Sequence, residues 1–117
     1  MFADMKSMVT KAWREQYALL AINCMNLESA RAAVRVAEKH RAPIILNLYQ
    51  GHLVHFPAPI AVAVVKTLAE EASIPVALAL DHGKDPVRIR QAFRAGFSGL
   101  MIDASAFALE ENIRQTR

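Results

Sequence analysis

The adjacent residues Asp81 and His82 carry the strongest chemical signal in the sequence. They follow an apolar run at residues 74–80 and precede Gly83 and Lys84. The run is typical of a buried strand, and α/β proteins build their sites beyond the carboxyl ends of such strands. A carboxylate transfers protons, while an imidazole transfers protons or binds a metal. Because neighbouring residues leaving a strand point in different directions, the pair predicts a site in which the two groups divide the work.

Each member of this pair also has a simpler explanation. Asp81 is the best candidate for a general acid or base, and the alternative is an aspartate that caps a helix or forms a salt bridge. His82 is the best candidate for a metal ligand, and the alternative is a histidine held only by hydrogen bonds. No second ligand follows at local spacing, so a zinc site with three protein ligands is not contained in this segment.

Other polar residues take supporting parts in this hypothesis. Asn23 and Asp103 end other apolar runs, and Asp103 either orients its neighbours, contacts a cation or caps the strand end. Lys84 suits an anion, although a solvated lysine is the simpler expectation. Cys24 is expected to be a small packed residue rather than a nucleophile, because no base is adjacent to it.

The remaining motifs narrow the function. We expect His40, His52 and His55 to be surface residues, the last two in a loop that contains a glycine. The sequence contains no GxGxxG, P-loop, CxxC or HExxH pattern, which argues against dinucleotide binding and nucleotide hydrolysis.

A repeat indicates how the candidate residues are positioned. Residues 37–48 and 69–80 each contain a helix end, a short turn, a proline and an apolar run, with Pro43 and Pro75 lying 32 residues apart. One strand and one helix of an eightfold α/β barrel take about 30 residues together. The period therefore favours barrel units over short solenoid repeats.

The pattern predicts alternating helices and strands. Strands are expected at residues 17–23, 44–49, 76–80 and 99–103, a loop at 50–57, and helices at 5–16, 26–40, 59–72, 85–95 and 109–117. Nearly continuous apolar strands are typical of a parallel sheet covered on both faces. The fold class is therefore α/β, with Asn23, Tyr49, Asp81 and Asp103 expected along one end of the sheet.

Composition sets the limits of these interpretations. The chain has 117 residues, 54% hydrophobic and 21% charged, which predicts one globular domain but is too short for a complete barrel of about 250 residues. The net charge of +3 comes from basic residues interspersed with acids, so we expect no nucleic-acid partner. A single cysteine, no signal peptide and no apolar stretch of about 20 residues predict a soluble cytoplasmic protein.

Several segments resemble motifs of one known protein family. AINCMNLE at residues 21–28 resembles the family's AFNVNNLE, and residues 42–46 with the following Gln50 and Gly51 resemble its second strand and loop. PVALALDHG at 75–83 is similar to PVALHLDHG. Residues 95–105 are similar to AGFTSVMIDGS, and EENI at 110–113 is identical to the family segment. The family that these segments resemble is the class II (metal-dependent) ketose-bisphosphate aldolases, with fructose- and tagatose-bisphosphate aldolases as the nearest members.

The resemblance implies a TIM barrel, with residues 1–117 forming about the first four βα units of a single barrel domain. It implies a bound Zn²⁺ with His82 as one of three histidine ligands, and a monovalent cation near the phosphate. Asp81 would transfer a proton at the substrate hydroxyl or at the aldehyde oxygen. Zinc would polarise the ketone in reversible cleavage to dihydroxyacetone phosphate and an aldehyde. The family often has a phosphate-contacting serine where Tyr49 stands, and a tyrosine there argues against a bisphosphate substrate.

The chain is therefore expected to be the N-terminal portion of such an aldolase, either truncated or a fragment, and inactive by itself. The family's other two zinc histidines lie in its second half. The alternative is a non-catalytic half-barrel that assembles with itself or a partner, because its outer strands would be bare and apolar. A sugar-phosphate epimerase or isomerase is a third candidate. A homo-oligomer is expected in each case.

Overall fold

The computed structural model describes residues 1–117 and shows an α/β fold. Four parallel strands form one sheet in the order β1-β2-β3-β4. The elements along the chain are α1 (Met5–Glu15), β1 (Leu20–Asn23), α2 (Leu27–Lys39), β2 (Ile44–Tyr49), the 3₁₀ helix η1 (Gln50–Val54), α3 (Ala58–Glu71), β3 (Val76–Gly83), α4 (Pro86–Ala95), β4 (Gly99–Ile102) and α5 (Leu109–Thr116). The predicted fold class is confirmed.

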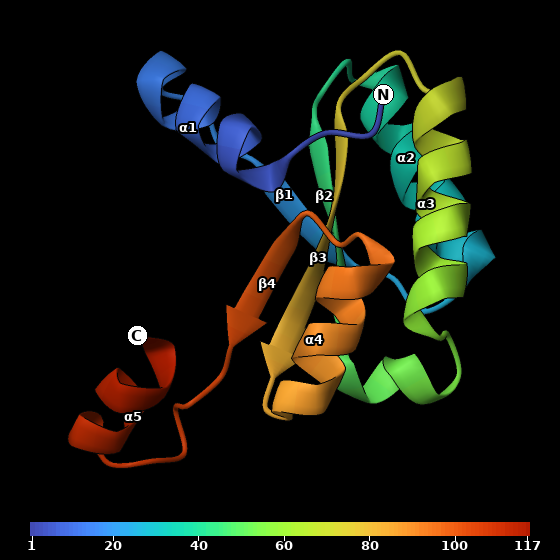
Figure 1. The fold of residues 1–117 in the computed structure, drawn as a ribbon. Coiled ribbons are helices and arrows are strands. Elements are labelled where there is room, and N and C mark those ends of the chain that lie inside the picture. Colours follow the sequence, from blue (N-terminus) through green and yellow to red (C-terminus); the bar gives the residue numbers. More distant parts are fainter.

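Helices α2, α3 and α4 cover one face of the sheet (Figure 1). Alternate residues of the two central strands point to this face and are almost completely buried; they are Leu46, Leu48, Leu78 and Leu80. Since successive side chains of a strand point to opposite faces, one apolar set per strand serves this helical layer. The layer contains most of the hydrophobic core.

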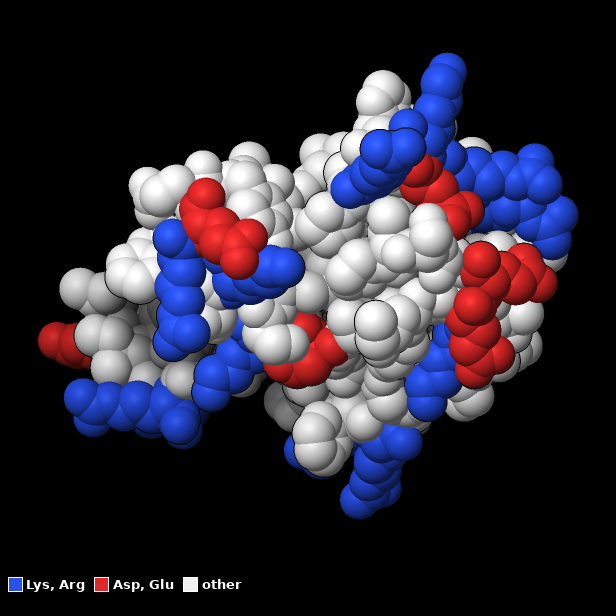
Figure 2. All heavy atoms as spheres, turned by 90° about the horizontal axis from the view of Figure 1, so that it is seen from above, with Lys and Arg blue, Asp and Glu red and all other residues white.

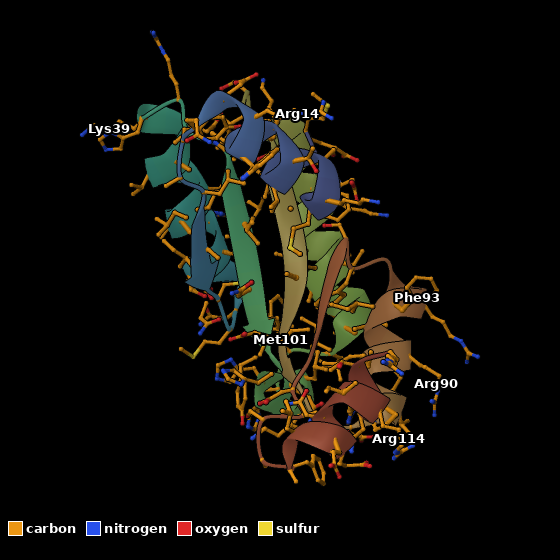
Figure 3. The ribbon with its side chains drawn as sticks, turned by 90° about the vertical axis from the view of Figure 1, so that its left-hand side faces the viewer. Arg14, Lys39, Arg90, Phe93, Met101 and Arg114 are labelled. Atoms are coloured by element: carbon orange, nitrogen blue, oxygen red, sulfur yellow. The ribbon has the colours of Figure 1, made fainter.

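The opposite face of the sheet is covered at its amino half by α1 (Figure 3). Met8 of α1 packs with Ile45, Ala77 and Ala79 in a second, smaller core. The two alanines are short, so the helix can approach the strands closely.

Local signals set the boundaries of α4. Asp85 accepts a hydrogen bond from the Val87 N–H at the amino end, followed by Pro86 at the first helical position. Gly96 ends the helix with φ 105°, a left-handed conformation that glycine adopts without steric cost. Both signals were predicted from the sequence.

Two expectations about the elements are corrected. Strand β1 begins at Leu20 rather than Tyr17, because its pairing with β2 begins at Leu20 opposite Ile44. The expected loop at residues 50–57 begins with the 3₁₀ helix η1. The outer strands β1 and β4 are largely exposed, in agreement with the bare outer strands expected of a half-barrel.

The surface shows no segregation of charge in the view from above (Figure 2). Lysine and arginine side chains lie among acidic ones around an uncharged centre. No helix is both long enough and apolar enough to cross a lipid bilayer.

Candidate active site at the carboxyl end of the sheet

A β-bulge places the Asp81-His82 pair at the carboxyl end of β3. Leu80 pairs with Leu100 and Gly83 pairs with Ile102, so β3 uses one residue more than β4 over the same span. His82 has φ 50°, a conformation that is uncommon for a residue other than glycine. Bulges redirect side chains and are frequent beside active sites. Here the bulge extends β3 beyond Leu80, where the sequence predicted that it ends.

The His82 ring is held by a carboxylate of the neighbouring strand segment. Its Nδ1 lies 2.8 Å from Oδ2 of Asp103, just after β4. The backbone N–H of Asp103 donates to the Gly83 carbonyl at 2.8 Å, which fixes the two segments together. Because a carboxylate accepts, Nδ1–H donates, and Nε2 has no partner within the chain.

Asp103 is the one buried charged residue of the chain. Its Oδ1 accepts hydrogen bonds from the backbone N–H and the hydroxyl of Ser105, at 3.1 and 2.6 Å. The Ser105 hydroxyl, followed by His82, holds the pKa of Asp103 well below its usual range. The carboxylate therefore stays ionised at neutral pH. It both orients His82 and caps its own strand end, which were two of the three alternatives that the sequence left open, contact with a cation being the third.

Lys84 also approaches Asp103, with Nζ 3.6 Å from Oδ2. The sequence favoured a solvated lysine. The side chain is largely exposed, yet its charge lies against a buried carboxylate, so that expectation is corrected in part. No sequence pattern links residues 84 and 103, because the contact depends on how β3 and β4 pair.

Asp81 differs from Asp103 in its surroundings. It is half-buried, lies opposite Tyr49 in the register of β2 and β3, and takes part in none of the ion pairs of the chain. Its carboxylate is thus free to act on a bound molecule. Asp103, in contrast, already accepts hydrogen bonds from His82 and Ser105.

An aromatic group flanks the pair. The Tyr49 ring meets the rings of His52 and His82 edge to face, with centroids 5.4 and 6.0 Å away. A Cβ at Gly51 would lie 2.5 Å from the Tyr49 ring, so a side chain at this position would displace the ring. His52 is half-buried with an unpartnered Nδ1, which corrects the expectation that it is a surface residue. His40 and His55 are exposed, as predicted.

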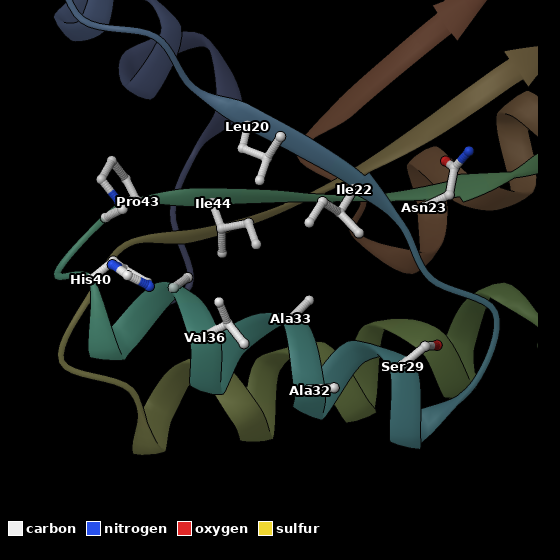
Figure 4. Close-up of a pocket in the computed structure, with 12 residues that line it drawn as sticks. Leu20, Ile22, Asn23, Ser29, Ala32, Ala33, Val36, His40, Pro43 and Ile44 are labelled. Atoms are coloured by element: carbon white, nitrogen blue, oxygen red, sulfur yellow. The ribbon is translucent and has the colours of Figure 1, made fainter.

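Asn23 ends β1, two strands away from Asp81, and is not brought into this group. Its side chain points away from α2 (Figure 4). The apolar groove in the same view, of about 570 Å³ and lined by residues such as Ile22, Val36 and Ile44, lies on the helical side of the sheet. None of Asp81, His82 and Asp103 lines this groove, so the chemistry is not assigned to it.

Comparison with known proteins agrees with this geometry. The family model described as "Fructose-bisphosphate aldolase class-II" matches residues 3–117. The chain belongs to this family. A fructose-bisphosphate aldolase of Geobacillus stearothermophilus is 39% identical over 116 residues, which are 97% of this chain and 40% of that protein. A 6-phospho-5-dehydro-2-deoxy-D-gluconate aldolase of Bacillus licheniformis is 39% identical over 119 residues, 99% of this chain and 41% of that protein.

Solved structures show the same relationship. The crystal structure of the YdjI aldolase from Escherichia coli K12 matches with a TM-score of 0.89 and 32% identity, over 99% of this chain and 44% of that one. Fructose-bisphosphate aldolase from Campylobacter jejuni shares the fold with a TM-score of 0.82 at 22% identity. This class II aldolase-family chain thus spans about 40% of the length of the curated relatives it matches. Its four βα units have TIM-barrel architecture.

The donor set of this class II aldolase-family chain suits one metal bond but not a whole site. No three His, Cys, Asp or Glu side chains lie together in a group that could hold a metal ion. His82 alone has the required arrangement, with Nδ1 engaged by a carboxylate and Nε2 free. Metal-binding histidines usually donate their second nitrogen to such a carboxylate.

Proposed function

We propose that this chain supplies the proton-transfer group and one metal ligand of a zinc-dependent aldolase that acts on a sugar phosphate. The reaction is reversible cleavage of a ketose phosphate to dihydroxyacetone phosphate and an aldehyde. The observation that carries the proposal is the β-bulge at Asp81 and His82, where the buried Asp103 accepts a hydrogen bond from the His82 ring. Family membership supports an aldolase over the epimerase or isomerase alternative.

In this proposal His82 binds the metal through Nε2. Asp103 accepts a hydrogen bond from Nδ1–H, which fixes the tautomer in which Nε2 carries a lone pair and makes the ring a stronger ligand. Bound zinc would act as a Lewis acid toward the substrate carbonyl. The remaining zinc ligands, and the ligands of any monovalent cation, would come from outside residues 1–117.

Asp81 is proposed to move the proton. During cleavage its carboxylate takes the proton from the substrate hydroxyl that becomes the aldehyde oxygen, and it returns the proton during synthesis. A group on a rigid element suits this task, since proton transfer depends on hydrogen-bond distance. Asp81 lies on β3, the most buried strand of the sheet.

Tyr49 bears on the choice of substrate. It lies opposite Asp81 and against His82, is bulky, and is 39% exposed. We propose that it limits the space for a second phosphate group, so that the enzyme prefers a ketose with one phosphate. Comparing cleavage of a mono- and a bisphosphate by the wild type and by the Tyr49→Ser variant tests this preference.

Asp81 can be tested in a chimera that joins residues 1–117 to the remaining part of the Geobacillus stearothermophilus relative. Asp81→Asn retains the side-chain shape but not the proton acceptor, so the cleavage rate should fall by roughly 10²–10⁴. Asp85→Asn is the matched control, because asparagine caps a helix as well as aspartate does. Normal turnover of the Asp81→Asn chimera would contradict the proposed role.

A second candidate function is a non-catalytic half-barrel that assembles with itself or with a partner. The exposed outer strands favour it, since Leu20 of β1 is 61% exposed and Ile102 of β4 is 44% exposed. The Asp81→Asn experiment distinguishes the two functions, because only the catalytic function predicts a fall in the cleavage rate. We further propose a homo-oligomer and a cytoplasmic location, the latter because the single cysteine is buried and unpaired.

A further inference from the structure

The side chain of Gln50 connects the end of β2 to the turn that follows β3. Its Oε1 accepts hydrogen bonds from the backbone N–H groups of Lys84 and Asp85, at 2.8 and 2.9 Å. One amide oxygen has two lone pairs, so both are in use. Gln50 lies 34 and 35 positions before these two residues in the sequence, which makes this a tertiary contact.

The turn that Gln50 holds begins two residues after His82, at the end of β3. The left-handed φ of His82 is unfavourable for a side chain with a Cβ, and such conformations persist when the surroundings fix them. On the β4 side, the turn is fixed by the Asp103 N–H bond to the Gly83 carbonyl and by the His82–Asp103 contact. Gln50 fixes it from the β2 side.

The space around Gly83 shows how tightly the turn fits. A Cβ at Gly83 would lie 2.3 Å from the Met101 carbonyl oxygen and 2.8 Å from the Ile89 side chain. Gly83 therefore packs closely against β4 and α4, with no room for a side chain. The bonds to Gln50 oppose movement of the following residues away from β2.

Gln50 itself is well placed to hold this position. It is the first residue of η1, is half-buried, and follows Tyr49, whose ring contacts His82. Residues 49 and 50 thus act on the same turn, one through the ring of His82 and the other through the backbone after it.

The geometry points to Gln50 as a positioning residue that keeps the His82 ring against Asp103 through the backbone of Lys84 and Asp85. The inference rests on the proposed metal-binding role of His82 for its functional meaning. The contact itself does not depend on that role. Its consequence is that loss of the Gln50 acceptor frees the turn and lets His82 leave the tautomer with a free Nε2.

Hydrogen exchange of the 117-residue chain, measured by NMR, tests the contact first in the wild type. The Lys84 and Asp85 amides should be protected, although they lie in a connection at the surface. Exchange at the rate of an unstructured peptide would overturn the inference, and this measurement needs no variant that folds.

Two variants then separate the acceptor from the shape of the side chain. Gln50→Leu removes the acceptor, and exchange of both amides should rise by roughly tenfold or more. Gln50→Glu keeps two acceptor oxygens, and its exchange should stay close to that of the wild type. Equal effects of the two substitutions would contradict the role of Oε1.

The tautomer of His82 is the readout that a merely structural residue would not change. The ¹⁵N shifts of the ring should show Nδ1–H with an unprotonated Nε2 in the wild type and in Gln50→Glu, and a mixture of tautomers in Gln50→Leu. An unchanged tautomer in Gln50→Leu, with far-UV dichroism showing a folded chain, would refute the positioning role. If instead these results hold while Asp81→Asn retains activity, the proposed function fails and the Gln50 contact stands.

Discussion

The two central strands and the two outer strands of this sheet have opposite environments. Strands β2 and β3 are buried along most of their length, whereas three of the four residues of β1 are exposed and β4 is buried only at its first residue. The candidate site lies at the carboxyl end of β3, where a core of large apolar side chains fixes the backbone. The central strands therefore hold the site rigidly, while the outer strands leave surfaces that another polypeptide can cover.

A leucine-to-alanine substitution in a central strand and in an outer strand tests this difference in burial. Leu78→Ala removes a side chain with no exposed surface and should lower the free energy of unfolding by about 2–5 kcal/mol. Leu20→Ala, in the exposed strand β1, should lower it by less than about 0.5 kcal/mol. Denaturant unfolding measures both, and equal losses would contradict the difference in burial.

Association of the 117-residue chain probes the outer strands. Their unpaired backbone groups and exposed apolar side chains should drive self-association, so light scattering should report a dimer or larger species. A lysine in place of Leu20 or of Ile102 should reduce the apparent mass, because charges on outer strands oppose pairing. A monodisperse monomer of 12.9 kDa that unfolds cooperatively would show that the exposed strands need no cover.

Cys24 tests where burial begins after an outer strand, because it follows the exposed strand β1 and yet is only 1% exposed. Burial raises the pKa of the Cys24 thiol to about 11. The folded chain should therefore resist thiol-labelling reagents at pH 8 and react fully once unfolded. Rapid labelling of the folded chain would show that the Cys24 thiol is accessible, which would contradict its burial.

The same shift predicts a pH dependence of stability. A raised thiol pKa means that the folded state keeps its proton longer, so the contribution to stability is complete below the ordinary thiol pKa of about 8.5. It is lost as the pH rises toward 11. Cys24→Ala should remove this part of the pH dependence, measured as the difference between the two unfolding curves.

Much of the fold could be predicted from the sequence because its signals are local. The apolar runs of β2 and β3, the Asp85-Pro86 start of α4 and the Gly96 stop each depend on a few neighbouring residues. The burial of Cys24 was also predicted, since a small thiol without an adjacent base is typical of a packed residue. The exposure of the outer strands was expected as well, because about four βα units leave the first and last strands without neighbours.

The sequence singles out the residues of the candidate site but not their contacts. Asp81 and His82 stand out as a pair, and the structure adds that Asp103 lies beside His82. The bulge, the Lys84 contact and the double acceptor role of Gln50 depend on the register of β3 with its neighbours. Register is a property of the folded sheet, and nothing in the spacing of residues 50 and 84 encodes it.

The zinc content of the chimera with the Geobacillus stearothermophilus relative tests the central claim most directly, because the claim assigns a metal bond to His82. After dialysis, elemental analysis should find about one zinc per chain in the wild-type chimera and in the His55→Ala control, whose histidine is exposed. His82→Ala should lose most of its zinc, because a catalytic zinc held by three protein ligands cannot spare one. Full zinc content in the His82→Ala chimera would contradict the account.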